Sequence, residues 1–164
     1  MKIFIRDFDD GIHEVAGVVE PGQIELQEQK FYPEQLAIQA TVDRLDNIFR
    51  IKIRIQTQAK YVCDRCLAVF DRGFDELYEQ LYQLGSGTLD DDDEVEFLPE
   101  NATEIDISKA IHDAFILARP MQLLCRDDCK GLCPDCGADL NQKSCKCAEK
   151  KIDPRLVKLK SLLS

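Results

Sequence analysis

Apolar and polar residues alternate along much of the first half of the chain. Leu36, Ile38, Ala40 and Val42 occupy every second position of one segment. The segment 50–60 repeats the pattern, with an apolar side made by Ile51, Ile53, Ile55, Thr57 and Ala59. A period of two is typical of a half-buried strand, and residues 43–47 between the segments favour a turn. We therefore predict two antiparallel strands.

A third strand is expected after residue 66. Its aromatic residues are spaced by four, at Phe70, Phe74, Tyr78 and Tyr82. An even spacing keeps them on one face of a strand, but a spacing of four also fits one face of a helix. A strand that returns beside segment 50–60 is the favoured interpretation, and the helix remains the alternative.

Two helices and one break complete the pattern. Asp106 is a suitable N-cap for a helix that ends at Arg119-Pro120. Its apolar face comprises Ile107, Ala110, Ile111, Ala114, Phe115 and Ala118. Asp153 and Pro154 begin a short terminal helix with a leucine stripe. The run Asp90–Asp93 lacks the spacing of a calcium loop, so we interpret it as part of a solvated acidic loop.

Eight cysteines carry the candidate chemistry of this sequence of 164 residues. They form four closely spaced pairs: Cys63 with Cys66, Cys125 with Cys129, Cys133 with Cys136, and Cys145 with Cys147. No apolar run approaches the length of a membrane span, and charges from Lys2 onward argue against a signal peptide. We therefore expect a cytoplasmic protein with reduced thiols. Such pairs are typical of metal ligands, so we predict two structural zinc ions, with one ion or disulfides as alternatives.

The spacing also favours one pairing of these motifs. Cys133–Cys136 and Cys145–Cys147 are separated by a short loop and can close one site locally. The pairs Cys63–Cys66 and Cys125–Cys129 would then form a long-range second site. An interleaved assignment remains the alternative.

The charge is acidic overall and unevenly distributed. The formal net charge is -10, yet the chain from Cys125 onward holds nine basic and six acidic residues. Nucleic-acid affinity depends on local cations, so any such contact must be local. The candidate partner-binding residues are Arg50, Lys52, Arg54 and Lys60, along one strand. The simpler interpretation of this basic strand face is the solvated side of an amphipathic strand.

Nothing in the sequence matches a catalytic motif, so we predict that the protein is not an enzyme. Phosphate-binding loops, dinucleotide fingerprints and nucleophile elbows are absent. His13 and His112 are interpreted as ordinary residues rather than ligands. A thiol redox pair at Cys133 and Cys136 is the enzymatic alternative, although such pairs usually begin a helix.

The ordered motifs resemble the YceD family of large ribosomal RNA subunit accumulation proteins. The resemblance runs from about residue 10 to residue 163. It rests on Cys63-Asp64-Arg65-Cys66, Asp106-Ile107, Leu124-Cys125, the segment Cys129–Gly137, Leu140-Asn141 and Asp153-Pro154-Arg155-Leu156. It implies a non-enzymatic factor for accumulation of large-subunit (23S) ribosomal RNA and for ribosome biogenesis. The implied partner is ribosomal RNA or a large-subunit ribosomal protein, with no membrane and no small-molecule substrate.

Together these patterns predict an α+β fold. We expect an antiparallel β-rich body with a covering helix and a C-terminal zinc-binding segment. The body is expected in residues 1–84, the acidic loop in 85–101, the covering helix in 102–124, and the zinc-binding segment with its terminal helix in 125–164. The alternative function is a zinc-dependent thiol redox or regulatory protein that acts on other proteins.

Overall fold

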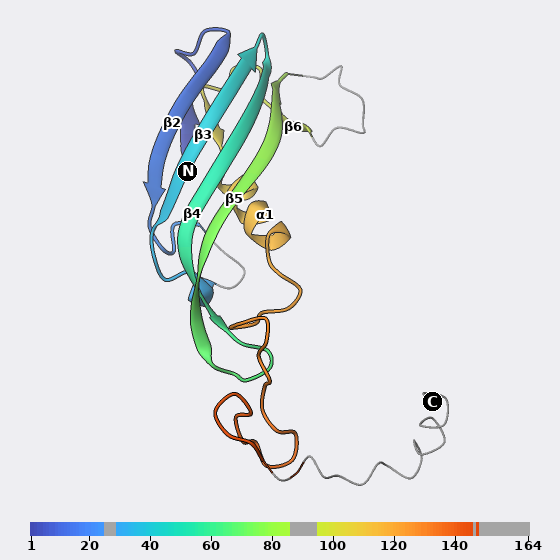
Figure 1. The fold of residues 1–164 in the computed structure, drawn as a ribbon. Coiled ribbons are helices and arrows are strands. Elements are labelled where there is room, and N and C mark those ends of the chain that lie inside the picture. Colours follow the sequence, from blue (N-terminus) through green and yellow to red (C-terminus); the bar gives the residue numbers. More distant parts are fainter. Residues whose placement is uncertain (25–28, 86–94, 146, 148–164) are drawn as a thin grey trace, which may run out of the picture. The chain divides into compact units, whose positions relative to one another are not determined.

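The computed structural model describes residues 1–24, 29–85, 95–145 and 147, and its chain divides into two compact units (Figure 1). The first unit comprises Met1–Tyr61 and Phe70–Met121. The second comprises Val62–Val69 and Gln122–Ser164, of which residues 62–69, 122–145 and 147 are described. Cys63 and Cys66 therefore lie in the unit of the C-terminal segment, whereas the sequence placed them in the β-rich body.

A five-stranded sheet, in the order β2-β3-β4-β5-β6, forms the frame of the first unit (Figure 1). Its strands are β2 (Gly11–Val19), β3 (Leu36–Leu45), β4 (Ile48–Val62), β5 (Val69–Leu84) and β6 (Val95–Leu98). β2 and β3 pair antiparallel, as do β3 and β4, whereas β5 and β6 pair parallel. The prediction of a β-rich body is confirmed, but one edge strand is parallel.

The hairpin of β3 and β4 follows the alternating pattern of the sequence. Leu45 pairs with Ile48, so the turn is only Asp46 and Asn47 and is tighter than predicted. Asp46 has φ of +53°, in the left-handed region that Asp tolerates better than most residues. The alternate apolar positions of both strands are buried, which confirms the predicted inner face, although Thr57 of that face is only half-buried.

The aromatic segment is a strand, as the favoured interpretation predicts. Phe74 and Tyr82 of β5 are buried, and Phe74 stacks on Phe115 of α1 (Ser108–Leu117) at 4.5 Å between ring centroids. The Tyr32 ring lies 4.5 Å from the same Phe115 ring. These contacts place the apolar face of α1 against the inner face of the sheet, so α1 is the covering helix.

Three expected boundaries differ from the structure. The helix occupies only ten residues of the segment 102–124, because residues 104–106 form strand β7 (Glu104–Asp106). β7 pairs antiparallel with β1 (Lys2–Phe4), outside the main sheet. Asp106 therefore ends a strand, and the N-cap of α1 is Ile107 rather than the predicted Asp106. The Asp106 carboxylate still accepts a hydrogen bond from the Ser108 backbone N–H at 3.0 Å. The segment expected as an acidic loop also contains β6.

Two sequence predictions lie outside the described residues: the aspartate run Asp90–Asp93 and the terminal helix after Asp153. A short 3-10 helix, Gln29–Phe31, completes the described elements. No described helix has the length and apolar character that a membrane crossing would need.

Candidate metal centres

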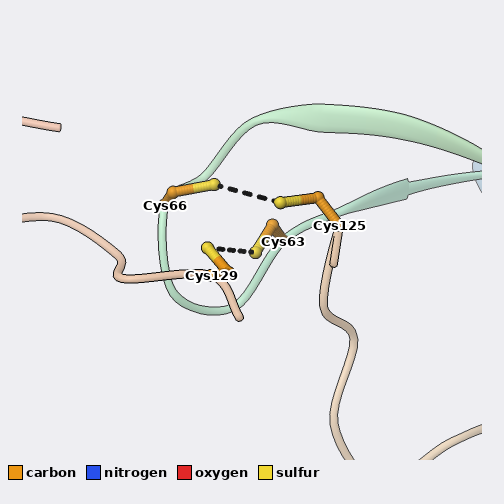
Figure 2. A group of neighbouring side chains, drawn as sticks. All are labelled: Cys63, Cys66, Cys125 and Cys129. Atoms are coloured by element: carbon orange, nitrogen blue, oxygen red, sulfur yellow. Dashed lines mark hydrogen bonds between the residues drawn. The ribbon is translucent and has the colours of Figure 1, made fainter. Parts of the chain in front are cut away.

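The first group of thiols joins two segments that lie far apart in the sequence. Cys63 and Cys66 come from the turn between β4 and β5, and Cys125 and Cys129 come from the chain beyond residue 122. Figure 2 shows the four side chains pointing toward one another. The Cys63 and Cys129 sulfurs lie 3.8 Å apart, and the Cys66 and Cys125 sulfurs lie 3.7 Å apart. We call this set the first centre.

The sulfur spacing of the first centre fits a tetrahedral ion. Four sulfurs bound at about 2.3 Å to one ion lie about 3.8 Å from one another. The Cys63–Cys129 and Cys66–Cys125 sulfur separations, 3.8 and 3.7 Å, match that value. A disulfide would need about 2.05 Å, and all eight cysteines are free. All four sulfurs lie within 4.8 Å of one another, so the first centre could hold one metal ion.

The second centre is built locally. Its sulfurs come from Cys133, Cys136, Cys145 and Cys147, and all lie within 4.8 Å of one another. Cys133 is buried, whereas Cys136 is exposed. In the first centre, by contrast, both Cys63 and Cys129 are buried. The two centres thus share a ligand set but differ in how far solvent reaches the sulfurs.

Each centre begins with a Cys-x-x-Cys turn, and the two turns have the same backbone hydrogen bonds. In the first, the Cys63 N–H donates to the Ala68 carbonyl at 2.9 Å, and the Leu67 N–H donates to the Cys63 carbonyl at 2.9 Å. In the second, the equivalent bonds join Cys133 to residue 138 and residue 137 to Cys133, at 2.8 and 2.9 Å. We call these turns the first and second knuckle. Backbone N–H groups in such turns point toward the sulfurs and stabilise thiolates.

Neighbouring side chains hold the first centre in place. The Asn141 side-chain amide lies 3.5 Å from the Cys129 sulfur as a donor, and its oxygen accepts from the Lys130 backbone N–H at 2.8 Å. The Arg65 guanidinium donates to the Cys129 carbonyl at 3.0 Å, and the Asp64 carboxylate accepts from the Leu123 backbone N–H at 2.6 Å. Such outer contacts orient metal ligands. The sequence motifs contained these residues, but no local pattern indicated their roles.

The thiol pKa values reflect the crowding of four sulfurs. Burial opposes ionisation of Cys63, but backbone N–H groups, first that of Cys125, lower the pKa of Cys63 to about 6. Burial and neighbouring thiols raise the pKa of Cys125 to about 12. In the second centre the pKa of Cys133 is lowered by the Cys136 backbone N–H, and contact with the Cys136 side chain raises the pKa of Cys147 to about 12. A divalent cation removes this mutual opposition, because it stabilises all four thiolates together.

The structure brings the thiols together as the favoured pairing predicts, and the interleaved assignment is wrong. Neither histidine joins a group of metal-ligating side chains within the described part of the chain. His13 stacks on Phe8, and His112 contacts the Asp113 carboxylate. Cys133 and Cys136 lie in a turn rather than at a helix start, so the geometry usual for a redox pair is missing there.

The basic strand face is paired within the sheet. Arg54 of β4 makes two hydrogen bonds of 2.8 Å to the Asp75 carboxylate of β5. Arg50 and Lys52 both reach Glu79 of β5. Lys60 lies 3.8 Å from Asp71. These contacts give all four cations a carboxylate neighbour, which favours the interpretation as the solvated face of an amphipathic strand.

The sequence that builds these centres also matches a family of known proteins. The family described as large ribosomal RNA subunit accumulation protein YceD matches residues 51–163, which include all eight cysteines. The chain belongs to the YceD family. An accumulation factor, rather than an enzyme, is what the family's description names.

Two plant relatives carry the same description. The YCED homolog 1, chloroplastic, of Arabidopsis thaliana is 31% identical over 160 residues, covering 76% of this chain and 48% of the relative. The Zea mays homolog is 42% identical over 69 residues, covering 42% of this chain and 23% of the relative. An uncharacterized protein of Mycobacterium tuberculosis is 33% identical over 102 residues, covering 62% of this chain and 49% of the relative. The chain thus spans about half the length of these relatives or less. No solved structure matches it.

Proposed function

We propose that this protein is a zinc-binding, non-enzymatic factor that supports the accumulation of large-subunit ribosomal RNA, and hence ribosome biogenesis, in the cytoplasm. Two groups of four converging thiols are the observation that carries the metal part of this proposal. Membership of the YceD family carries the biological process. The direct partner would be ribosomal RNA or a large-subunit ribosomal protein.

Zinc is the metal that best suits these centres. Zn²⁺ favours tetrahedral sites made of four thiolates, and the sulfur separations of the first centre fit its bond length. Four protein ligands fill the coordination of the ion, whereas catalytic zinc keeps a position for water. Both ions would therefore be structural, and their contribution would be to fold the second unit.

Metal analysis tests the zinc assignment. Purified, freshly reduced protein should contain about two zinc ions per chain by elemental analysis, because the chain offers two sets of four ligands. A metal-free protein with eight titratable thiols and an intact fold would contradict the assignment. Iron in place of zinc, seen as visible absorption, would change the metal but leave the two centres.

Sedimentation tests the proposed process. In a sucrose gradient of cell extract, the protein should co-sediment with precursors of the large ribosomal subunit. Cells that lack it should hold less large-subunit ribosomal RNA, and expression of the wild-type chain should restore the level. Unchanged levels of that RNA, together with a protein found only at the top of the gradient, would overturn the proposal.

A further inference from the structure

The two knuckles differ in sequence at one position where both backbones are left-handed. The residue after the second cysteine is Gly137 in one knuckle and Leu67 in the other, with φ of +69° and +59°. Left-handed backbone is open to glycine and strained for a residue with a Cβ. The second knuckle therefore uses the residue that its geometry favours, and the first knuckle does not.

Packing of the side chain does not explain the leucine. The Leu67 residue is 63% exposed, so little of its apolar surface is removed from water. A leucine at a left-handed position thus combines backbone strain with an exposed apolar side chain. Strained residues persist where the surroundings impose them, and they cluster at functional sites.

Leu67 is not alone in being exposed and apolar. Val62 at the end of β4 is 40% exposed, and Val69 at the start of β5 is 65% exposed. Ala68 between them is also exposed, so residues 67–69 form an exposed run of three apolar residues. An exposed run of apolar residues is unfavourable in a water-soluble surface unless it serves a function such as binding a partner. We call Val62, Leu67, Ala68 and Val69 the knuckle patch.

We propose that the knuckle patch is a docking surface for a basic protein segment that carries an aliphatic anchor residue. This inference rests on the proposed function and names the kind of partner: a large-subunit ribosomal protein rather than RNA. The negative charge of the first centre favours a basic protein segment as the partner. Four thiolates around one Zn²⁺ carry a formal charge of -2, and the exposed Asp64 lies in the same turn. A cationic segment complements that charge.

The same features disfavour a nucleic acid at this surface. Phosphates are bound by free cations, and single-stranded bases stack on aromatic side chains. The knuckle patch is aliphatic, and the guanidinium of Arg65, the one cation of the turn, donates to the Cys129 carbonyl. The patch therefore presents apolar contact area that adjoins, in the chain, the cysteines of a centre with negative formal charge, which is the chemistry of a protein interface.

Position 67 allows a test in which stability and docking respond differently. Leu67→Gly and Leu67→Asn both suit a left-handed backbone but remove the apolar side chain, whereas Leu67→Met keeps an apolar side chain. Leu45→Asn is the matched control, because Leu45 is 66% exposed on the first unit. The full, zinc-loaded chains are titrated against purified large-subunit precursor particles in sedimentation assays. Zinc content and the thermal midpoint are measured in parallel.

We expect Leu67→Gly and Leu67→Asn to bind the particles about tenfold more weakly than wild type, as an anchor residue of an interface would. Leu67→Met and Leu45→Asn should bind within about twofold of wild type. All variants should keep two zinc ions, and the thermal midpoint of Leu67→Gly should equal or exceed that of wild type. A photoreactive benzoylphenylalanine at Val69 should crosslink to a Lys/Arg-rich protein segment.

Three results would overturn the inference. Wild-type binding by Leu67→Gly and Leu67→Asn would show that the side chain does not dock. Loss of zinc or of thermal stability in those variants would show a structural role for Leu67. Crosslinks to RNA would assign the surface to the nucleic acid. If wild type itself does not bind the particles, the proposed function fails and this inference fails with it.

Discussion

At the residue scale, one glycine decides how closely the two segments of the first centre approach. Gly131 lies between the ligands Cys129 and Cys133, with φ of +75°. A Cβ at this position would lie 2.9 Å from the Arg65 carbonyl oxygen, which also accepts a hydrogen bond from the Leu132 N–H at 3.0 Å. The first knuckle and the C-terminal segment thus meet backbone to backbone, and only glycine fits between them.

Substitution of the two knuckle-associated glycines should therefore have unequal effects. Gly131→Ala adds both left-handed strain and a backbone clash, so we expect a loss of about 2 kcal/mol or more in unfolding free energy. In Gly137→Ala the added Cβ would meet no atom within 4 Å, so only the left-handed strain should lower the unfolding free energy, by about 1 kcal/mol. Chemical denaturation of the zinc-loaded proteins measures both values. Equal losses would contradict the close-contact argument.

At the scale of elements, β4 and β5 show how a strand pair neutralises its open face. The ion pairs Arg54–Asp75 and Arg50–Glu79 fall in opposite order along the two strands, as in an antiparallel hairpin. Each of these side chains is well exposed to solvent, so the individual pairs stabilise the sheet only weakly. Their main effect is to remove the excess of positive charge that the sequence of β4 alone suggests.

The pair at Asp75 makes a titration prediction. Hydrogen bonds from Arg54 and Gln56 lower the pKa of Asp75 to about 2, below its ordinary value of 3.8. Because the folded-state pKa is the lower one, the stabilising contribution is complete above pH 4 and is lost as the pH falls toward 2. NMR of the Asp75 carboxyl carbon should give a pKa well below 3.8 in wild type and a higher pKa in Arg54→Met, where only the hydrogen bond from Gln56 still lowers it. In the control Lys52→Met, the Asp75 pKa should stay low.

The two metal centres make a prediction about release. Cys136 of the second centre is exposed, whereas two sulfurs of the first centre belong to buried residues. A chelator should therefore remove zinc in two phases, with the second centre emptied first. Cys145→Ser with Cys147→Ser should leave only the slow phase. If the double variant keeps the fast phase instead, the first centre is the one that releases zinc first.

At the scale of the whole molecule, the first unit does not depend on the cysteines for its core. Its buried residues come from the strands and α1, including Ile51, Ile53, Tyr82, Ile111 and Phe115. All eight cysteines belong to the second unit. The chain therefore combines a unit that buries apolar side chains with a unit whose described part is built around two candidate metal centres.

This division predicts a selective effect of ligand removal. Cys63→Ser with Cys66→Ser should lower the zinc content from about two ions to one, because the second centre keeps its four sulfurs. The sheet of the first unit should persist, since its core contains neither residue. Elemental analysis and far-ultraviolet circular dichroism measure the two effects. Loss of both ions, or of the strand signal, would show that the units fold together.

The sequence alone determined the elements whose signal is local. Alternation in residues 36–42 and 51–59 specified the inner face of β3 and β4, because side chains of a strand point to opposite faces in turn. The spacing of the cysteine pairs favoured the observed composition of the centres, because the short loop between Cys136 and Cys145 lets the second centre close locally. It left an interleaved assignment open. The strand alternation and the second centre depend on residues close together in the chain, so a single sequence contains them, whereas the first centre joins segments about 60 residues apart.

The tertiary structure decided whatever depends on distant partners. It made residues 70–82 a strand, since pairing beside β4 and stacking of Phe74 on Phe115 favour that conformation over a helix of equal periodicity. It set the carboxylates of β5 opposite the cations of β4, and it added the parallel strand β6 within an acidic segment. It also gave Leu67 a left-handed backbone, because the first knuckle must close around its sulfurs. Register and closure depend on contacts between residues far apart in the chain, and local periodicity does not encode those contacts.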